Sequence, residues 1–230
     1  MSKNVVLNII MGAFFIIVIG LVYLNFFVEV DSSNIVYKQY CDDLIDINDN
    51  AMFKTKANFI NKDTLAVLVQ SQEDFPLSLY VNVNFYDKSG KVVSTETSSI
   101  TTFPNNYGVA SISVPALDEN QNPGNIVIQL AGHEIDNDVV DVSNISYESN
   151  ESYPLVVKTT NNTTSNISQL GTQVVALRKG RIVGVDVFYH DSLAGGASVS
   201  DESYAFGTND DEPKPTYDDL LIFTTSANIG

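Results

Sequence analysis

The chain has 230 residues, of which 44% are hydrophobic, and its 28 acidic and 12 basic side chains give a formal net charge of −16 at pH 7. Nucleic acid and anionic lipid would both be repelled by this charge, so neither is expected as a partner. With one cysteine, Cys41, the chain cannot form an internal disulfide, and its stability must come from hydrophobic cores. Cys41 is either a buried thiol or a bridge to another chain.

An almost continuous apolar run extends from Val5 to Val28, and only Asn8 and Asn25 are strongly polar within it. A helix of about 20 apolar residues crosses a hydrocarbon core of about 30 Å, whereas the apolar part of a cleaved signal peptide has only about 7–15 residues. The run therefore predicts a transmembrane signal anchor over residues 5–28, which would contact the lipid bilayer directly.

The charges beside the anchor predict its orientation. Lys3 lies before the apolar run, and Glu29 and Asp31 lie just after it. Because the positive flank stays in the cytoplasm, residues 1–4 are expected to form a short cytoplasmic tail. We expect a single-pass protein of the cell membrane whose C-terminal domains are extracytoplasmic.

Residues 29–50 are expected to form a juxtamembrane connector. Their apolar side chains fall near helical spacing, which favours a short amphipathic helix, with a first β-strand as the alternative. Asp46, Asn48 and Asn50 have the alternate spacing of a calcium loop, but Ala51 and Ala57 occupy the positions of its glycine and its bidentate glutamate. We interpret this stretch as a polar hinge.

From residue 51 onward, short apolar or alternating runs are separated by turn-forming residues such as Lys-Ser-Gly and Asn-Pro-Gly. Strands at roughly ten-residue spacing predict an all-β sandwich or barrel. Residues 51–138 are expected to form a first β-sandwich, residues 139–152 a linker, and residues 153–230 a second β-sandwich. The repeat is indicated by two aromatic stretches, Val81–Thr97 and Val183–Ser203, in which Phe188 and Tyr189 correspond to Phe85 and Tyr86.

The stretch "VNFYDKSGKVV" resembles the FxLYD domain, a small extracytoplasmic β-sandwich module of anchored bacterial and archaeal proteins. Tyr86 and Asp87 match its motif, while Val83 replaces the phenylalanine and Phe85 the leucine. The second copy departs further, since His190 stands at the aspartate. The resemblance implies two tandem Ig-like or FxLYD-like modules and no catalytic role. A carboxylate at the Asp87 position is expected to cap the amides of the turn that follows.

The sequence offers no catalytic, cofactor-binding or metal-binding residues. His133 and His190 lie in different halves of the chain, and neither has a partner at metal-ligand spacing. Lys54, Lys56 and Lys62 are interpreted as a solvated strand face. The acidic stretches at residues 209–212 and 217–219 are interpreted as exposed loops, with a cation site as the alternative.

Five Asn-x-Ser/Thr sequons are clustered around the expected linker, and they begin at Asn144, Asn150, Asn161, Asn162 and Asn166. In a host with an Asn-glycosylation system, this clustering predicts a glycosylated, protease-resistant linker.

These features predict a membrane-anchored, outward-facing, non-catalytic surface protein that acts in binding or in envelope assembly. Its protein partner is expected on the C-terminal module, whose Gly-Gly and Asp-Asp-Glu-Pro loops would stand farthest from the bilayer. Unpaired edge strands leave self-association open. The alternatives are a pilin-like filament subunit, although the basic-Gly processing site is missing, and an enzyme with an unrecognised carboxylate site.

Overall fold

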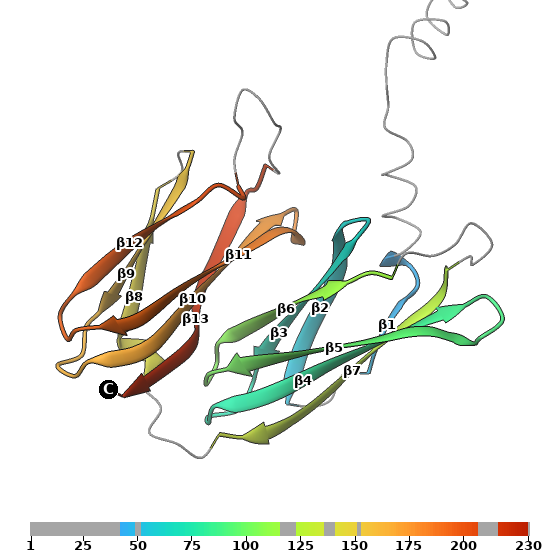
Figure 1. The fold of residues 1–230 in the computed structure, drawn as a ribbon, viewed down its shortest axis with the longest axis horizontal. Coiled ribbons are helices and arrows are strands. Elements are labelled where there is room, and N and C mark those ends of the chain that lie inside the picture. Colours follow the sequence, from blue (N-terminus) through green and yellow to red (C-terminus); the bar gives the residue numbers. More distant parts are fainter. Residues whose placement is uncertain are drawn as a thin grey trace, which may run out of the picture. The chain divides into compact units, whose positions relative to one another are not determined.

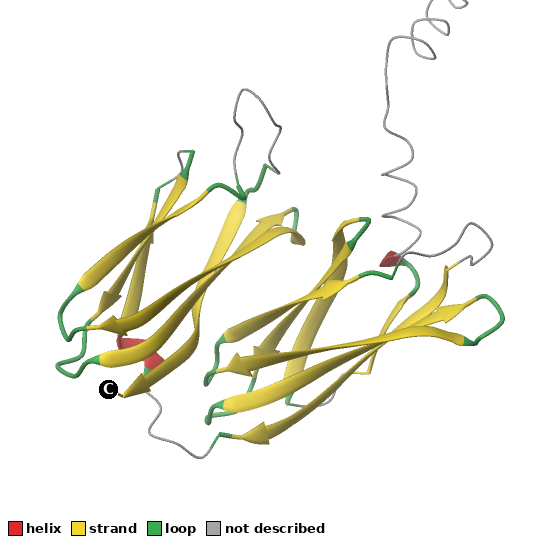
Figure 2. Ribbon diagram, viewed as in Figure 1, coloured by secondary structure: helices red, strands yellow, loops and turns green. Residues whose placement is uncertain are grey.

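The structure, a computed structural model, describes residues 42–48, 52–115, 123–135, 141–150, 153–206 and 216–229. All of these described residues belong to one compact unit. Apart from a single helical residue, Asp42, its described regular elements are β-strands and one short 3-10 helix (Figures 1 and 2). The predicted anchor at residues 5–28 and Cys41 lie outside the described residues. Within the described ranges, no helix is both long and apolar enough to cross a membrane.

The first seven strands form two sheets. Sheet A has the order β1-β7-β4-β5, with β1 parallel to β7 and the other pairs antiparallel, and sheet B has the antiparallel order β2-β3-β6. The bounds are β1 Ile45–Asn48, β2 Phe53–Asn61, β3 Thr64–Ser71, β4 Leu77–Asp87, β5 Val92–Thr102, β6 Tyr107–Ser113 and β7 Pro123–Glu134.

The remaining strands form two further antiparallel sheets, sheet C with the order β11-β10-β13 and sheet D with the order β12-β9-β8 (Figure 1). The 3-10 helix η1 (Val142–Asn144) leads into β8. The bounds are β8 Ile145–Ser149, β9 Leu155–Asn161, β10 Ile167–Arg178, β11 Arg181–Leu193, β12 Ser198–Ser203 and β13 Asp219–Ile229.

The all-β prediction is confirmed, and the alternation in β4 shows its physical basis. Leu79, Val81 and Val83 are fully buried, whereas Tyr80 between them is exposed. Successive side chains of a strand point to opposite faces, so this sequence buries one face of sheet A and leaves the other to solvent.

Strand β3 is buried on both faces. Leu65, Val67 and Val69 alternate with Ala66 and Leu68, and all five are buried. Strand β10 has the same property, because its consecutive residues 174–177 are all buried. An unbroken apolar run of this kind is typical of a strand covered on both sides. Sheets B and C are therefore inner layers, each covered on two faces.

The strand order of β2–β7 returns in β8–β13. The order β7-β4-β5 in sheet A corresponds to β13-β10-β11 in sheet C, and β2-β3-β6 corresponds to β8-β9-β12. Matching backbone bonds support this alignment: Ser71 N donates to Asn106 O at 3.1 Å, and Asn161 N donates to Ala197 O at 3.0 Å. Strand β10 is thus the counterpart of β4.

The predicted correspondence between the two aromatic stretches is wrong by one strand. Residues 81–97 form a hairpin within sheet A, but β11 lies in sheet C and β12 in sheet D, so residues 183–203 change sheets. Phe85 and Tyr86 lie near the end of β4, whereas Phe188 and Tyr189 lie in the middle of β11. A Phe-Tyr pair fits any half-buried strand, so it does not specify which strands of the two halves correspond.

Two connecting stretches also differ from expectation. In the connector, residues 45–48 form strand β1, which is the alternative to the expected helix, and most of the positions of that helix lie outside the described residues. Asp46 and Asn48, interpreted as part of a polar hinge, are exposed on this strand. Asn50 lies outside the described residues. The stretch expected as a linker, residues 139–152, contains η1 and β8, which pairs with β9 in sheet D.

Candidate functional site

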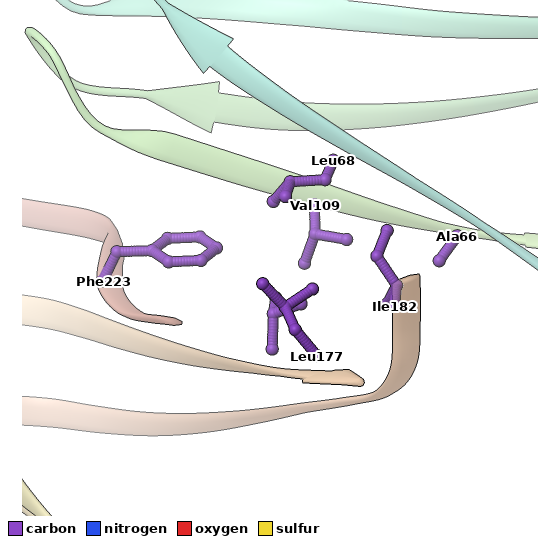
Figure 3. Packing of buried hydrophobic residues seen from close by; sticks show 7 residues of the cluster. Ala66, Leu68, Val109, Leu177, Ile182 and Phe223 are labelled. Carbon is purple, nitrogen blue, oxygen red and sulfur yellow. The ribbon is translucent and has the colours of Figure 1, made fainter. Parts of the chain in front are cut away.

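The most extensively built site in the described chain is the contact between sheets B and C. Its apolar part joins side chains of β3 and β6 to side chains of β10, β11 and β13 (Figure 3). Each member is at most 8% exposed, so the contact is as dry as a domain core. The cluster comprises Ala66, Leu68, Val109, Val175, Leu177, Ile182 and Phe223.

A second apolar contact comes from the turn between β5 and β6. Phe103, 2% exposed, packs against Ile145, Ile167, Leu170 and Leu193, which belong to sheets C and D. A single large ring from the N-terminal sheets thus closes one end of the C-terminal core. Asn105, with φ of 53°, allows the tight turn that carries this ring.

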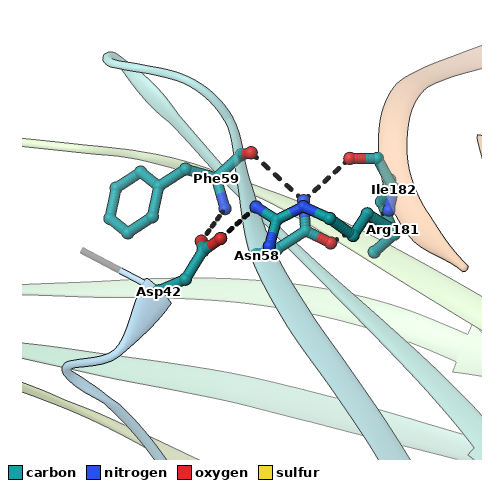
Figure 4. Close-up of polar contacts among 5 residues, drawn as sticks. All are labelled: Asp42, Asn58, Phe59, Arg181 and Ile182. Atoms are coloured by element: carbon teal, nitrogen blue, oxygen red, sulfur yellow. Dashed lines mark hydrogen bonds and ion pairs between the residues drawn. The ribbon is translucent and has the colours of Figure 1, made fainter. Parts of the chain in front are cut away.

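Two side-chain amides, the buried Asn58 and the half-buried Gln173, add polar contacts to the same surface. Asn58 of β2 donates from Nδ2 to Ile182 O at 2.7 Å and accepts from Ile182 N at 2.9 Å (Figure 4). Gln173 of β10 makes the converse pair with Val109 of β6, donating to its carbonyl at 3.1 Å and accepting from its N–H at 3.3 Å. Each half of the chain therefore supplies one side chain that completes the backbone bonding of the other half.

Charged groups close the rim of the contact. Asp42 accepts a hydrogen bond from Phe59 N at 3.0 Å and pairs with the guanidinium of Arg181 (Figure 4). Lys56 donates from Nζ to Gly180 O at 2.8 Å. The side chain of Asp42 is only 13% exposed, but that of Arg181 is 50% exposed. An ion pair that is open to solvent on one side contributes little to the free energy of folding, so its main effect is to position the chain at the rim. The chain just before β1 is thereby tied to both halves.

The sequence did not reveal Asn58 or Gln173. An isolated amide in an alternating strand looks like a surface residue, because amide side chains are usually exposed. The prediction of a solvated strand face is confirmed for Lys54 and Lys56, which are exposed on β2, whereas Lys62 is exposed in the turn that follows.

The β4–β5 turn has the predicted geometry. The Asp87 carboxylate accepts from Ser89 N at 2.8 Å, from Ser89 Oγ at 2.6 Å and from Lys91 N at 3.0 Å. The Ser89 hydroxyl, with help from the Lys91 backbone, holds the pKa of Asp87 below its ordinary value. Gly90 has φ of 80°, which a residue with a side chain adopts only under strain. This motif is structural.

The two histidines lie in different sheets. His133 is exposed on β7 beside Tyr80, with ring centroids 6.3 Å apart. His190 of β11 contacts the carboxylate of Asp201 on β12, with Nε2 and Oδ2 2.9 Å apart, and so ties sheet C to sheet D. Among the described residues, no group of three or more His, Cys, Asp or Glu side chains is placed to hold a metal ion.

The acidic stretches separate into two cases. Residues 209–212 lie outside the described residues. In the second stretch, Tyr217 packs against Phe206, Asp218 accepts from Lys179 N at 2.9 Å, and Asp219 accepts from Leu220 N at 2.9 Å. The latter two carboxylates cap backbone amides of the β10–β11 turn and of β13.

A hollow of about 640 Å³ lies beside Phe103, between the β3–β4 loop, the β5–β6 turn and η1. Asp74, Asn105 and Asp141 line it together with apolar groups. Hydrogen bonding from Ser143 holds the pKa of Asp141 below its ordinary value, so this carboxylate is ionised at neutral pH. Two carboxylates alone do not make a cation site.

The sequons begin in η1, just after β8, at the end of β9 and in the β9–β10 turn instead of in a free linker. Asn161 is fully buried, and its Nδ2 donates to Ser165 O at 2.9 Å and Leu193 O at 3.1 Å. It is therefore unsuited to carry a glycan in the folded protein. Asn144, Asn162 and Asn166 are exposed, and Asn150 is half-buried beside the start of β9.

No protein-family model matches the chain, and no curated protein matches it. Among solved structures, the chain is similar to the crystal structure of red sea bream transglutaminase, with a TM-score of 0.25 and 9% sequence identity. That match covers 77% of this chain but only 28% of the transglutaminase chain. The chain thus spans less than a third of that protein's length, and a similarity at this level carries no argument about function. The FxLYD resemblance stays a prediction.

Proposed function

We propose that the chain is a membrane-anchored, outward-facing, non-catalytic surface protein built from two tandem β-sandwich modules. The modules are Ig-like or FxLYD-like, the first formed by sheets A and B and the second by sheets C and D. Residues 5–28 hold them at the cell membrane, and the modules bind a partner or take part in surface assembly.

The observation that supports this proposal best is the contact between sheets B and C. It combines a dry apolar cluster, the inserted ring of Phe103 and the converse amide pairs of Asn58 and Gln173. Modules joined only by a flexible linker reorient freely, whereas modules with a large hydrophobic contact move together. A fixed pair presents its outer faces at a constant geometry, which suits a protein that displays a binding surface.

The position of Asp42 supports the same role. It lies at the start of the described chain and contacts both Phe59 and Arg181. The connector therefore enters the folded unit at the junction of the two modules. A mechanical force on either module would therefore be transmitted to the proposed anchor through this junction.

Outward orientation can be tested with a thiol probe. In a Cys41→Ser background, Lys88→Cys places one thiol in the exposed β4–β5 turn. A membrane-impermeant maleimide should label intact cells as completely as lysed cells. Labelling that appears only after lysis would contradict the proposal.

Two further measurements address the anchor and the partner. Mapping of the mature N-terminus separates the proposed anchor, which begins at Met1 or Ser2, from a filament subunit trimmed close to residue 5. Crosslinking of the full chain in native membranes, followed by mass spectrometry, should recover a protein partner or a second copy. Recovery of neither would contradict a role in protein binding or in assembly.

A further inference from the structure

The outer face of sheet A differs from the rest of this acidic chain. Cross-strand pairing places one set of side chains from β4, β5 and β7 together on the face opposite the buried residues of β4. Among them only a histidine is ionisable, although the whole chain has a formal charge of −16. These residues, the neutral face, are Ser78, Tyr80, Asn82, Asn84, Thr95, Thr97, Ser99, Thr101, Val127, Gln129, Ala131 and His133. The exposed Asp46 of β1, which pairs with Val127, adds a carboxylate at the margin of the same face.

An aromatic ring stands above the centre of this face. Tyr80 is 46% exposed, and its cross-strand neighbours are the short side chains of Ser99 and Ala131. The ring of His133 lies 6.3 Å away at an interplanar angle of 32°. The two rings are tilted against each other and form a short aromatic strip that is open to solvent. Such a strip offers apolar ring faces with polar edges.

Beside the rings lie two identical hydrogen-bonding units. Thr97 Oγ1 donates to Asn82 Oδ1 at 2.8 Å, and Thr95 Oγ1 donates to Asn84 Oδ1 at 2.8 Å. Each bond fixes the amide and leaves its Nδ2 group as a donor and the threonine oxygen as an acceptor. Two residues along a strand span about 6.8 Å, so the units repeat at that spacing.

We propose that the neutral face binds a neutral glycan. Sugar hydroxyls both donate and accept hydrogen bonds, which the Asn–Thr units supply in pairs, and the apolar C–H face of a pyranose ring stacks on a tyrosine ring. An anionic polysaccharide would need cationic side chains, which this face lacks, and the acidic chain would repel it. This inference rests on the proposed function, because it names the ligand class of the displayed unit.

The test uses the full chain in detergent micelles with cellohexaose, dextran and yeast mannan as neutral probes and heparin as the anionic probe. Binding is measured by isothermal titration calorimetry. At least one neutral probe should bind. Tyr80→Ala and the double variant Asn82→Ala/Asn84→Ala should each weaken that binding about tenfold or more, through loss of stacking and of the amide donors respectively.

Tyr189→Ala is the matched control, because Tyr189 is a 71% exposed tyrosine on β11, in sheet C rather than sheet A. The affinity of the Tyr189→Ala variant for the neutral probe should stay within about twofold of that of the unsubstituted chain. Circular dichroism melting of each variant excludes unfolding as the cause of lost binding.

Three outcomes would overturn the inference: no neutral probe binds, only heparin binds, or Tyr189→Ala weakens binding as much as Tyr80→Ala does. The maleimide labelling and the membrane crosslinking test the proposed surface role, and their results do not depend on whether a glycan binds. A chain that labels on intact cells but binds no neutral glycan disproves the glycan site alone. A chain that labels only after lysis disproves the proposed surface role itself.

Discussion

Asn58 and Ile182 are bonded like neighbouring residues of one ladder, although 124 positions of sequence separate them. The Asn58 amide both donates to and accepts from the Ile182 backbone, and Asn58 is 4% exposed. A backbone group buried beneath a packed sheet must find a partner or lose stability. The Asn58 amide supplies that partner from another sheet. Sheets B and C can therefore pack closely while the N–H and carbonyl of Ile182 on β11 keep hydrogen-bond partners.

The first prediction concerns this amide. Asn58→Ala removes both bonds and leaves the Ile182 N–H and carbonyl buried without them, which should lower the free energy of unfolding by about 2–4 kcal/mol. Urea unfolding of the full chain in micelles measures the change. Asn228→Ala is the control, because its amide bonds to Gln169 on an exposed part of β13, and its effect should stay within about 0.5 kcal/mol. If the two substitutions changed the free energy of unfolding equally, the hydrogen bonds between Asn58 and Ile182 would contribute no more to stability than those of an exposed amide.

The second prediction concerns the inserted ring. Phe103→Ala should destabilise the chain by about 3–5 kcal/mol, because it empties a space within the core formed by Ile145, Ile167 and Leu170. Val92→Ala, at a 45% exposed position of β5, should change stability by less than about 0.5 kcal/mol. If Phe103→Ala were as mild as the control, the ring would not hold the two pairs of sheets together in solution.

The third prediction uses the lowered pKa of Asp87. A carboxyl group whose pKa is lower in the folded than in the unfolded chain stabilises the fold above the unfolded value, and this effect is lost as pH falls through the folded value. Asp87→Asn should therefore lower the urea midpoint at neutral pH. The difference should shrink as pH falls below the ordinary value of 3.8 and should be absent once the pH lies well below the folded pKa. A difference that persists unchanged in acid would assign the effect to something other than the carboxylate charge.

The strands were largely predictable because their signal is local. The alternation from Leu77 to Phe85 depends only on which face of one strand is buried, and the structure buries that face. The Asp87 turn was predictable for the same reason, since its bonds reach only to Ser89 and Lys91. Such patterns need no knowledge of distant partners.

The contact between sheets B and C was not predicted, because it depends on residues far apart in the chain. One signal was present: residues 65–69 and 174–177 are unbroken apolar runs, which indicate burial on both faces. Neither Asn58 nor Gln173 gave such a signal, since each is a lone amide whose partner lies in another sheet. The one-strand error in the repeat has a related cause, because a short aromatic motif does not specify which sheet a strand joins.

The last prediction separates the five sequons by the environment of each asparagine. Asn161 is fully buried, its Nδ2 donates to two carbonyls, and its Oδ1 accepts from Thr163 N at 3.0 Å. A glycan on Nδ2 would break both donor bonds and place a bulky polar group inside the core, at a cost the fold does not survive. Asn166 is exposed in the following turn and has room for a sugar.

Peptide mapping of folded chain produced in a glycosylating host should therefore find carbohydrate at Asn166 and none at Asn161. Thr163→Ala, which removes the Asn161 sequon, should leave the glycan mass unchanged, whereas Ser168→Ala, which removes the Asn166 sequon, should reduce it by one glycan. Thr163 also bonds to Asn161 Oδ1 through its hydroxyl, so a melting curve must accompany this variant. Carbohydrate at Asn161 in folded, monodisperse protein would contradict the burial of that amide and with it the position of the β9–β10 turn.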